Sequence, residues 1–226
     1  MVRLAVRSVS EEEREKHRMS ELEKMHTGEL YDPQDPAITE QQIKAMELLY
    51  DYNRTRPSEG EKRQAMLRKM FAQVGENCWI EPPFHANWAG RFARLGNNVY
   101  ANFNLTLVDD TEITIGDCTM IGPNVTIAAA GHPLDSTLRG HGLQYNLPVR
   151  IGANCWLGAG VLVMPGVTIG DCTVVGAGSV VTRDLPSGVL AYGNPCREIR
   201  PISEEDRVFY RKGCRVPEEL LNRYGL

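Results

Sequence analysis

The sequence predicts an all-β solenoid, a parallel β-helix of hexapeptide repeats, with an N-terminal α-helical region. Three observations lead to this prediction. Between Ile115 and Pro186 the chain repeats every six residues with one interruption, and all nine first positions are Ile, Leu or Val. Six of these nine hexads carry glycine at the second position. Residues 1–74 show helical periodicity instead.

The period of six decides the fold class, because amphipathic helices repeat every 3.6 residues and half-buried strands every two. A chain that turns a corner about every six residues, with an aliphatic residue inward each time, closes a triangular coil. Glycine at the second position is expected to supply the tight turn. The alternative, an ordinary sandwich of short strands, predicts drifting spacing and does not explain aliphatic residues that stay in phase.

The helical region is expected to contain three helices. Capping boxes begin them at Ser10, Thr39 and Ser58, and glycines end the first at Gly28 and the third near Gly75. The linker "GELYDPQDP" separates the first two helices. Four residues are expected on the apolar face of the second helix: Ile43, Met46, Leu49 and Tyr50.

The coils follow in order. "VGENCW" and "IEPPFH" form a first coil that a slipped segment, "ANWAGRFAR", ends. "LGNNVY", "ANFNLT" and "LVDDTE" form a looser second coil, with two extra residues before Ile115. The regular hexads are "IGDCTM", "IGPNVT" and "IAAAGH", then after the interruption "IGANCW", "LGAGVL", "VMPGVT", "IGDCTV", "VGAGSV" and "VTRDLP".

The interruption covers residues 132–150, and the repeat resumes in phase at Ile151. A folding defect would disturb the phase, so the excursion is interpreted as a selected loop. We therefore expect a helical region at 1–74, a β-helix at 75–203 with the loop 132–150, and a helical C-terminal tail at 204–226.

Composition excludes several classes of protein. The net charge of −4 gives no sign of a nucleic-acid or anionic-membrane surface. No run of eighteen apolar residues occurs, and the N-terminus is too poor in apolar residues for a secretory signal. A cytoplasmic protein is expected. The six cysteines are widely spaced without a CxxC pair, so buried thiols are expected instead of disulfides or a metal site.

His132 is the histidine best placed for chemistry. It closes the last hexad before the loop, so a rigid coil anchors it while it faces what the loop encloses. His141 lies further along the loop and is a weaker candidate. His17 and His26 fall on the polar first helix and are expected to be solvated.

Longer strings resemble the maltose and galactoside O-acetyltransferase family of hexapeptide-repeat acyltransferases. They include "GELYD", "FAQVGENCWIEPPF", "NNVYANFNLTLVDD", "GHPLD" and "GNPCREIRPI", and the similarity runs from about residue 24 to 203. The resemblance implies a left-handed β-helix and a homotrimer with active sites between subunits. It also implies acetyl-CoA as co-substrate, no metal, and direct transfer to a hydroxyl of a maltose-, glucoside- or galactoside-like sugar.

Roles for individual residues follow from this resemblance. His132 in "GHP" matches the general base, and Asn102 and Asp110 match acceptor-binding residues. Asn87 lies where the family has a small polar acceptor contact, although one residue is inserted nearby. Gln144, in the loop, replaces an acceptor position that is apolar in some members. The family's acidic residue in the linker aligns with a proline here, so Asp32 or Asp35 would substitute for it.

The resemblance places the co-substrate along the second half of the β-helix. The matching positions are Trp156, Ala159, Ala177, Thr182 and Arg183 along the coils. The Ala159 backbone N–H matches an oxyanion donor. Arg197 and Arg200 match a phosphate clamp, for which guanidinium groups are suited.

Three alternatives stay open. N-acetylation of an amino sugar or antibiotic would use the same machinery. A zinc carbonic anhydrase on the same coil needs three converging histidines, and the spacing of His85, His132 and His141 does not coincide across coils. A scaffold without catalysis would not need His132, Asn102 and Asp110.

Overall fold

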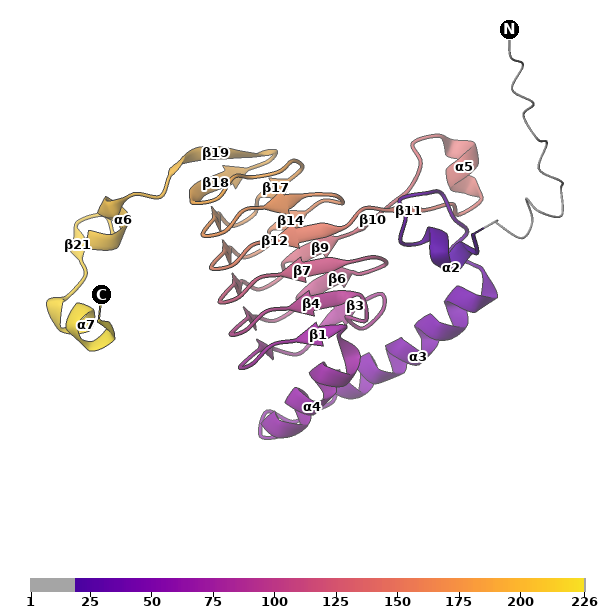
Figure 1. Cartoon of the computed structure of the whole chain (residues 1–226), viewed down its shortest axis with the longest axis horizontal. Helices are drawn as coiled ribbons and strands as arrows, with labels where there is room; N and C mark the ends of the chain where they lie inside the picture. Colours follow the sequence, from indigo (N-terminus) through magenta and orange to yellow (C-terminus); the bar gives the residue numbers. More distant parts are fainter. Residues whose placement is uncertain (1–18, 226) are drawn as a thin grey trace, which may run out of the picture.

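The computed structural model describes residues 19–225, and it shows a triangular prism of stacked coils flanked by helices (Figure 1). Three parallel sheets form its faces. The first face contains β1 (Gln73–Val74), β4 (Ala93–Leu95), β7 (Ile113–Ile115), β12 (Val149–Ile151) and β15 (Thr168–Ile169). The second contains β2 (Trp79–Ile80), β5 (Tyr100–Ala101), β8 (Met120–Ile121), β13 (Trp156–Leu157), β16 (Val174–Val175), β18 (Val189–Gly193) and the antiparallel β19 (Cys196–Pro201). The third contains β3 (His85–Ala86), β6 (Thr106–Val108), β9 (Thr126–Ala128), β14 (Leu162–Val163) and β17 (Val180–Val181).

The predicted β-helix is confirmed, and the residues that open each hexad lie in its core. These nine first positions are at most 2% exposed: Ile115, Ile121, Ile127, Ile151, Leu157, Val163, Ile169, Val175 and Val181. One first-position residue from each face meets the others on the prism axis. Burial of aliphatic surface along this axis therefore holds successive coils together.

The second-position glycines are needed for a reason other than the predicted turn. A Cβ added to Gly116 would lie 2.5 Å from the backbone nitrogen of Ala153 in the next coil. The left-handed turn itself falls at the fourth position, where seven residues have positive φ: Cys118, Asn124, Asn154, Gly160, Gly166, Cys172 and Gly178. Glycine at the second position thus permits close approach of stacked coils.

Replacement of Gly116 by alanine is expected to destabilise the prism by about 1–3 kcal/mol, because backbone atoms of the next coil cannot move aside cheaply. Gly140→Ala is the matched control, since a Cβ there meets nothing within 4 Å. Urea unfolding measures both. Equal unfolding midpoints for the two variants would contradict this account of glycine.

The helical region packs on the lower coils. It contains α2 (Glu21–Lys24), α3 (Pro36–Asn53) and α4 (Gly60–Met70), and α3 runs along the outside of the coils (Figure 1). Ser20 forms the capping box of α2 with Glu23, while the predicted box at Ser10 lies outside the described residues. The second and third helices begin a few residues away from their predicted starts at Thr39 and Ser58. Asp35 caps α3, and α4 begins at Gly60.

The predicted apolar face of α3 was largely wrong. Ile43, Met46 and Tyr50 are 62%, 44% and 53% exposed. The helix instead buries Leu49 together with three other positions, Ile38, Ala45 and Tyr52. Tyr52 competes successfully for the interior because its hydroxyl donates to the Ile80 carbonyl at 2.6 Å, which satisfies the polar end of a buried ring.

The remaining elements lie outside the prism. The short strand β10 (Ala130–Gly131) leads into the loop that interrupts the repeat, and the loop holds α5 (Ser136–Gly140) and β11 (Tyr145–Asn146). The tail holds α6 (Glu204–Val208), β20 (Phe209–Arg211), β21 (Cys214–Arg215) and α7 (Glu218–Tyr224), and it projects away from the coils (Figure 1). All six cysteines are unpaired, but Cys118 and Cys172 are exposed at corner positions, contrary to the expected burial. Within residues 19–225, no helix combines the length and the hydropathy needed to cross a membrane.

Candidate active site

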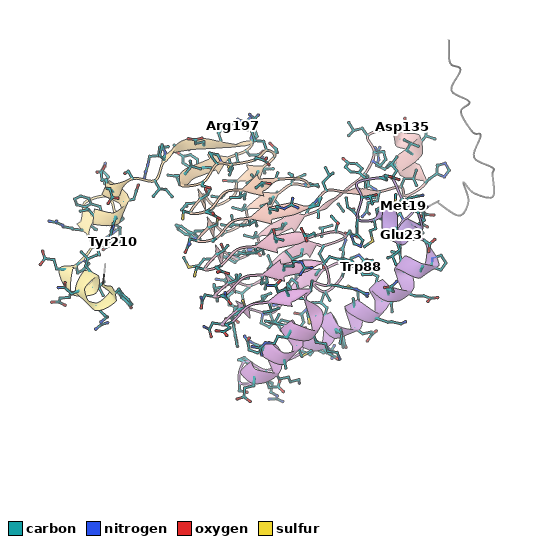
Figure 2. All side chains as sticks on the ribbon, in the orientation of Figure 1. Met19, Glu23, Trp88, Asp135, Arg197 and Tyr210 are labelled. Carbon is teal, nitrogen blue, oxygen red and sulfur yellow. The ribbon has the colours of Figure 1, made fainter. Side chains whose placement is uncertain are left out.

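The loop is anchored where it leaves the prism. The strand β10, just before the loop, pairs antiparallel with β11 inside it, with Ala130 opposite Asn146. His132 follows β10 directly and therefore lies at the paired root of the loop, while Asp135 at the start of α5 lies near its tip (Figure 2). The root is the part of the loop that backbone pairing holds most firmly.

The His132 imidazole is oriented by a backbone carbonyl. The ring is exposed, and its Nδ1 lies 2.9 Å from the Leu143 carbonyl oxygen. Because a carbonyl can only accept, Nδ1 carries the proton and Nε2 of the neutral ring keeps its lone pair. This is the tautomer that a general base requires.

Asp110 and Asn87, two of the residues predicted to bind the acceptor, lie together. The Asn87 amide donates to Asp110 Oδ2 at 2.8 Å, and the Trp88 indole N–H lies 3.3 Å from Asp110 Oδ1. Asp110 is 5% exposed, so a carboxylate here is largely shielded from water. Trp88 lies at the side of the coils that faces α3 (Figure 2), where it packs against Tyr31 in a second buried cluster.

Asp109 supports this arrangement from the interior, and the sequence did not single out this role. Its carboxylate is 0% exposed and accepts from the backbone N–H groups of Trp88 and Gly90, both at 2.8 Å. It therefore fixes the slipped segment that carries Asn87 and Trp88. Burial raises the pKa of Asp109 to about 7, and the neighbouring Asp110 adds to this, while the backbone N–H groups oppose it. The adjacent pair in "VDD" was the available signal.

The difference in unfolding free energy between the wild-type protein and Asp109→Asn is expected to depend on pH, because the Asp109 carboxyl titrates and an amide does not. The folded pKa of about 7 exceeds the ordinary 3.8, so folding favours the neutral carboxyl. Its contribution is complete below the unfolded value and is lost as pH rises through the folded one. The difference in unfolding free energy between the two proteins should therefore fall between about pH 4 and 8, by at most about 1.4 kcal/mol per pH unit.

Urea unfolding at several pH values measures this difference. Other titrating groups, such as His26, whose pKa burial lowers, are present in both proteins and cancel. A difference that stays constant across the range would contradict the assignment.

A buried polar network joins the loop to the N-terminal linker. Tyr31 and Gln144 form a two-way backbone bridge, and the Gln144 amide donates to the Tyr31 hydroxyl at 2.7 Å. The Asn146 amide lies within 3.3 Å of three oxygens, those of the Met25 carbonyl, the Tyr31 hydroxyl and the Asp110 carbonyl. Burial raises the pKa of Tyr31, which keeps this hydroxyl neutral. The bridge also fixes the backbone beside Leu143, whose carbonyl orients His132.

Gln144 and Asp32 were predicted to contact the acceptor. Gln144 is 8% exposed, and its amide N–H groups are already shared between Tyr31 and Asn146. Asp32 Oδ1 accepts the Gln34 backbone N–H at 2.9 Å. Both residues lie in the linker and loop root that adjoin His132, and their contact with an acceptor stays a prediction.

Asn102 lies on a different corner of the prism from His132. It follows β5 and precedes β6, which places it where the second and third faces meet. Asp110 and His132 lie between strands of the third and first faces. Within one chain, the predicted acceptor residues therefore lie in two groups, one at each of these two corners.

The corner with Asn102 also carries Ala159 and Ala177 in successive coils. At the corner between the first and second faces, by contrast, the backbone N–H of Ala153 donates to Asp171 of the next coil at 2.7 Å. The residue stacked on Ala159 is Ala177, which has no such acceptor. Within residues 19–225 the Ala159 N–H makes no hydrogen bond, so it is available to an external oxygen.

Trp156 lies in an apolar row on the outside of the second face. The parallel register aligns six outward residues in this row: Trp79, Tyr100, Met120, Trp156, Val174 and Leu190. Tyr100, Met120 and Trp156 are 38%, 54% and 53% exposed. The single chain thus leaves this face uncovered.

The remaining predicted co-substrate residues lie at the far end of the prism. Thr182 and Arg183 follow β17 and are exposed. Arg197 and Arg200 are exposed on β19, and Figure 2 shows Arg197 at this end. The Arg200 guanidinium already donates to both carboxylate oxygens of Asp206 at 2.7 Å. A bound phosphate would have to share this group with Asp206.

The histidines do not converge. His85 lies on β3, His132 at the root of the loop and His141 at the end of α5. No cluster of three or more His, Cys, Asp or Glu side chains able to hold a metal ion occurs in the described part of the chain.

Comparisons with known proteins agree with this architecture. Residues 24–75 match the maltose acetyltransferase hexapeptide capping motif, and residues 148–183 match the bacterial transferase hexapeptide of six repeats. The galactoside O-acetyltransferase of Lactococcus lactis is 47% identical over 199 residues, which cover 88% of this chain and 96% of that relative.

Two solved structures share the fold. A galactoside acetyltransferase in complex with coenzyme A has a TM-score of 0.86 and 45% identity, over 88% of this chain and all of that one. A hexapeptide-repeat acetyltransferase of Vibrio cholerae complexed with acetyl-CoA has a TM-score of 0.75 and 35% identity, over 82% of this chain and all of that one.

These similarities confirm the predicted left-handed β-helix and an acetyltransferase with acetyl-CoA as co-substrate. The alignments with this chain span nearly the whole length of these relatives, from the helical cap through the coils. The chain therefore belongs to the maltose and galactoside O-acetyltransferase family of hexapeptide-repeat acyltransferases.

Proposed function

We propose that this enzyme transfers the acetyl group of acetyl-CoA to a hydroxyl of a maltose-, glucoside- or galactoside-like sugar, with His132 as general base. The observation that carries the proposal is the hydrogen bond from His132 Nδ1 to the Leu143 carbonyl. It leaves the Nε2 lone pair available at a rigid position. The relatives with galactoside O-acetyltransferase activity supply the acceptor class.

The reaction proceeds by direct transfer. Nε2 of His132 removes the proton of the acceptor hydroxyl as its oxygen attacks the thioester carbonyl carbon. The negative charge on the carbonyl oxygen is stabilised by the Ala159 backbone N–H. When the intermediate collapses, the C–S bond breaks and the thiolate takes the proton back from Nε2. The products are the acetylated sugar and the free thiol of coenzyme A.

The remaining residues position the two substrates. Asn87, Asp110 and Asn102 hydrogen-bond the acceptor, and Asp109 maintains the segment that carries Asn87. Trp156, Ala159 and Ala177 line the pantetheine arm, and four exposed residues contact its nucleotide end: Thr182, Arg183, Arg197 and Arg200.

The active enzyme is a homotrimer with its sites between subunits. Asn102 and His132 lie on different corners of one prism, so a second copy has to bring them together. The apolar row on the second face contrasts with the outward row of the first face, where Arg94 and Arg150 pair with Glu112 at 3.6 and 3.5 Å. Of these two faces, the second is better suited to burial against another subunit.

A thiol-release assay tests the function. Acetyl-CoA is incubated with glucosides, galactosides, maltose and amino sugars, and the products are identified by mass spectrometry. Faster thiol release with a neutral glycoside and an ester product support the proposal. Release only with amino sugars, with an amide product, would favour the N-acetyltransferase alternative.

A further inference from the structure

A groove of about 800 Å³ lies between α3 and the first coils of the third face. Met46 and Tyr50 of α3 line one wall. His85 of β3 and Thr106 of β6 line the opposite wall, and Asn87 also lines the groove. Its volume is in the range of small-molecule binding sites.

The groove opens onto the residues proposed to hold the acceptor. Asn87 lines the groove and donates to Asp110 Oδ2 at 2.8 Å. A sugar hydrogen-bonded to these two side chains therefore has the groove beside it. Any part of the acceptor beyond that sugar would extend along α3.

The lining combines an aromatic platform with polar groups that have no partner. Tyr50 is 53% exposed, and Arg54 covers one side of its ring at 4.1 Å, which holds the ring in place. Glu47 and His85 also line the groove, and their side chains make no hydrogen bond or ion pair within residues 19–225. Asn53 differs, because both ends of its amide bond the backbone of Phe84.

This combination suits a sugar ring better than a purely apolar group. The C–H face of a pyranose packs against an aromatic ring, and its hydroxyls need hydrogen-bonding partners around the edge. An aryl group offers no hydrogen-bonding group to Glu47 and His85. A bound sugar ring would also account for the exposure of Met46 and Tyr50, which were predicted on the apolar face of this helix.

We propose that the groove is a second acceptor subsite that binds the neighbouring sugar ring of a di- or oligosaccharide, stacked on Tyr50. This inference rests on the proposed function and names the preferred acceptor within it. Binding energy from the second ring is used to position the reacting sugar at Asn87 and Asp110, so it raises kcat/KM.

The experiment compares matched pairs of acceptors. The values of kcat/KM for maltose and methyl glucoside, and for lactose and methyl galactoside, are measured with the wild-type protein, Tyr50→Ala and Ile43→Ala. Ile43 lies on the same helix, is 62% exposed and does not line the groove. A 4-nitrophenyl glycoside provides an aryl arm.

The wild-type protein is expected to prefer the disaccharide by about tenfold, and Tyr50→Ala to lose this preference while acting normally on the methyl glycoside. Ile43→Ala should behave as wild type. Equal kcat/KM for both members of each pair would overturn the proposed subsite and leave the proposed function standing. This is the result expected if a second copy of the chain fills the groove. A preference only for the aryl glycoside would also overturn it. No transfer to any glycoside would overturn the proposed function and the subsite with it.

Discussion

Replacement of His132 by alanine is expected to lower kcat/KM for acetyl transfer by about 10²- to 10⁴-fold, the usual contribution of a general base. The acceptor hydroxyl is very weakly acidic, so attack on the thioester is slow unless a base removes its proton. The thiol-release assay with the best acceptor measures the loss. The fold should be unaffected, because the exposed ring makes one hydrogen bond within the described residues, to Leu143.

His141→Ala is the matched control. His141 is exposed in the same loop, and its side chain makes no hydrogen bond among residues 19–225. This variant should keep wild-type kcat/KM. If His132→Ala instead kept more than about a tenth of the activity, the base would have to be another group.

The hexads predicted the coil correctly because their period is set by burial on the axis, which acts locally in each side of the triangle. The reason for glycine was misassigned because the contact that requires it is made with the next coil. Gly116 approaches Ala153, a residue far along the chain, and the local sequence around Gly116 does not reveal this contact. The face of α3 was misread for a similar reason: the coils below select Tyr52, whose hydroxyl finds the Ile80 carbonyl.

The candidate site was predictable where one motif carries the role, as with His132 at the root of the loop. The contacts that hold the site in place were not predictable, because they join segments that are distant in the sequence. Tyr31 and Gln144 are joined across more than a hundred residues, and Asp109 accepts from backbone groups of a segment whose path the sequence left undefined. The resemblance implied sites between subunits, and the assignment of strands to faces adds that Asn102 and His132 lie on different corners of one chain.

This separation predicts complementation between inactive variants. His132→Ala and Asn102→Ala chains, coexpressed with different tags and purified for both, form mixed trimers. If each site takes His132 from one subunit and Asn102 from the next, every mixed trimer contains one intact site. Activity should return to about one third of the wild-type value, although either variant alone is nearly inactive.

The control uses two residues at the same corner. Asp110 and His132 both lie between the third and first faces, and Asn146 joins the loop root to the Asp110 carbonyl at 3.3 Å. A mixture of His132→Ala and Asp110→Asn chains therefore contains no site with both residues intact, and it should stay inactive. Recovery in both mixtures would mean that Asp110 also acts across the interface. Recovery in neither mixture, with trimers verified by ultracentrifugation, would mean that His132 works with Asn102 of its own chain. That result would contradict a site shared between subunits, which is inferred from the positions of Asn102 after β5 and His132 after β10 at different corners of the prism.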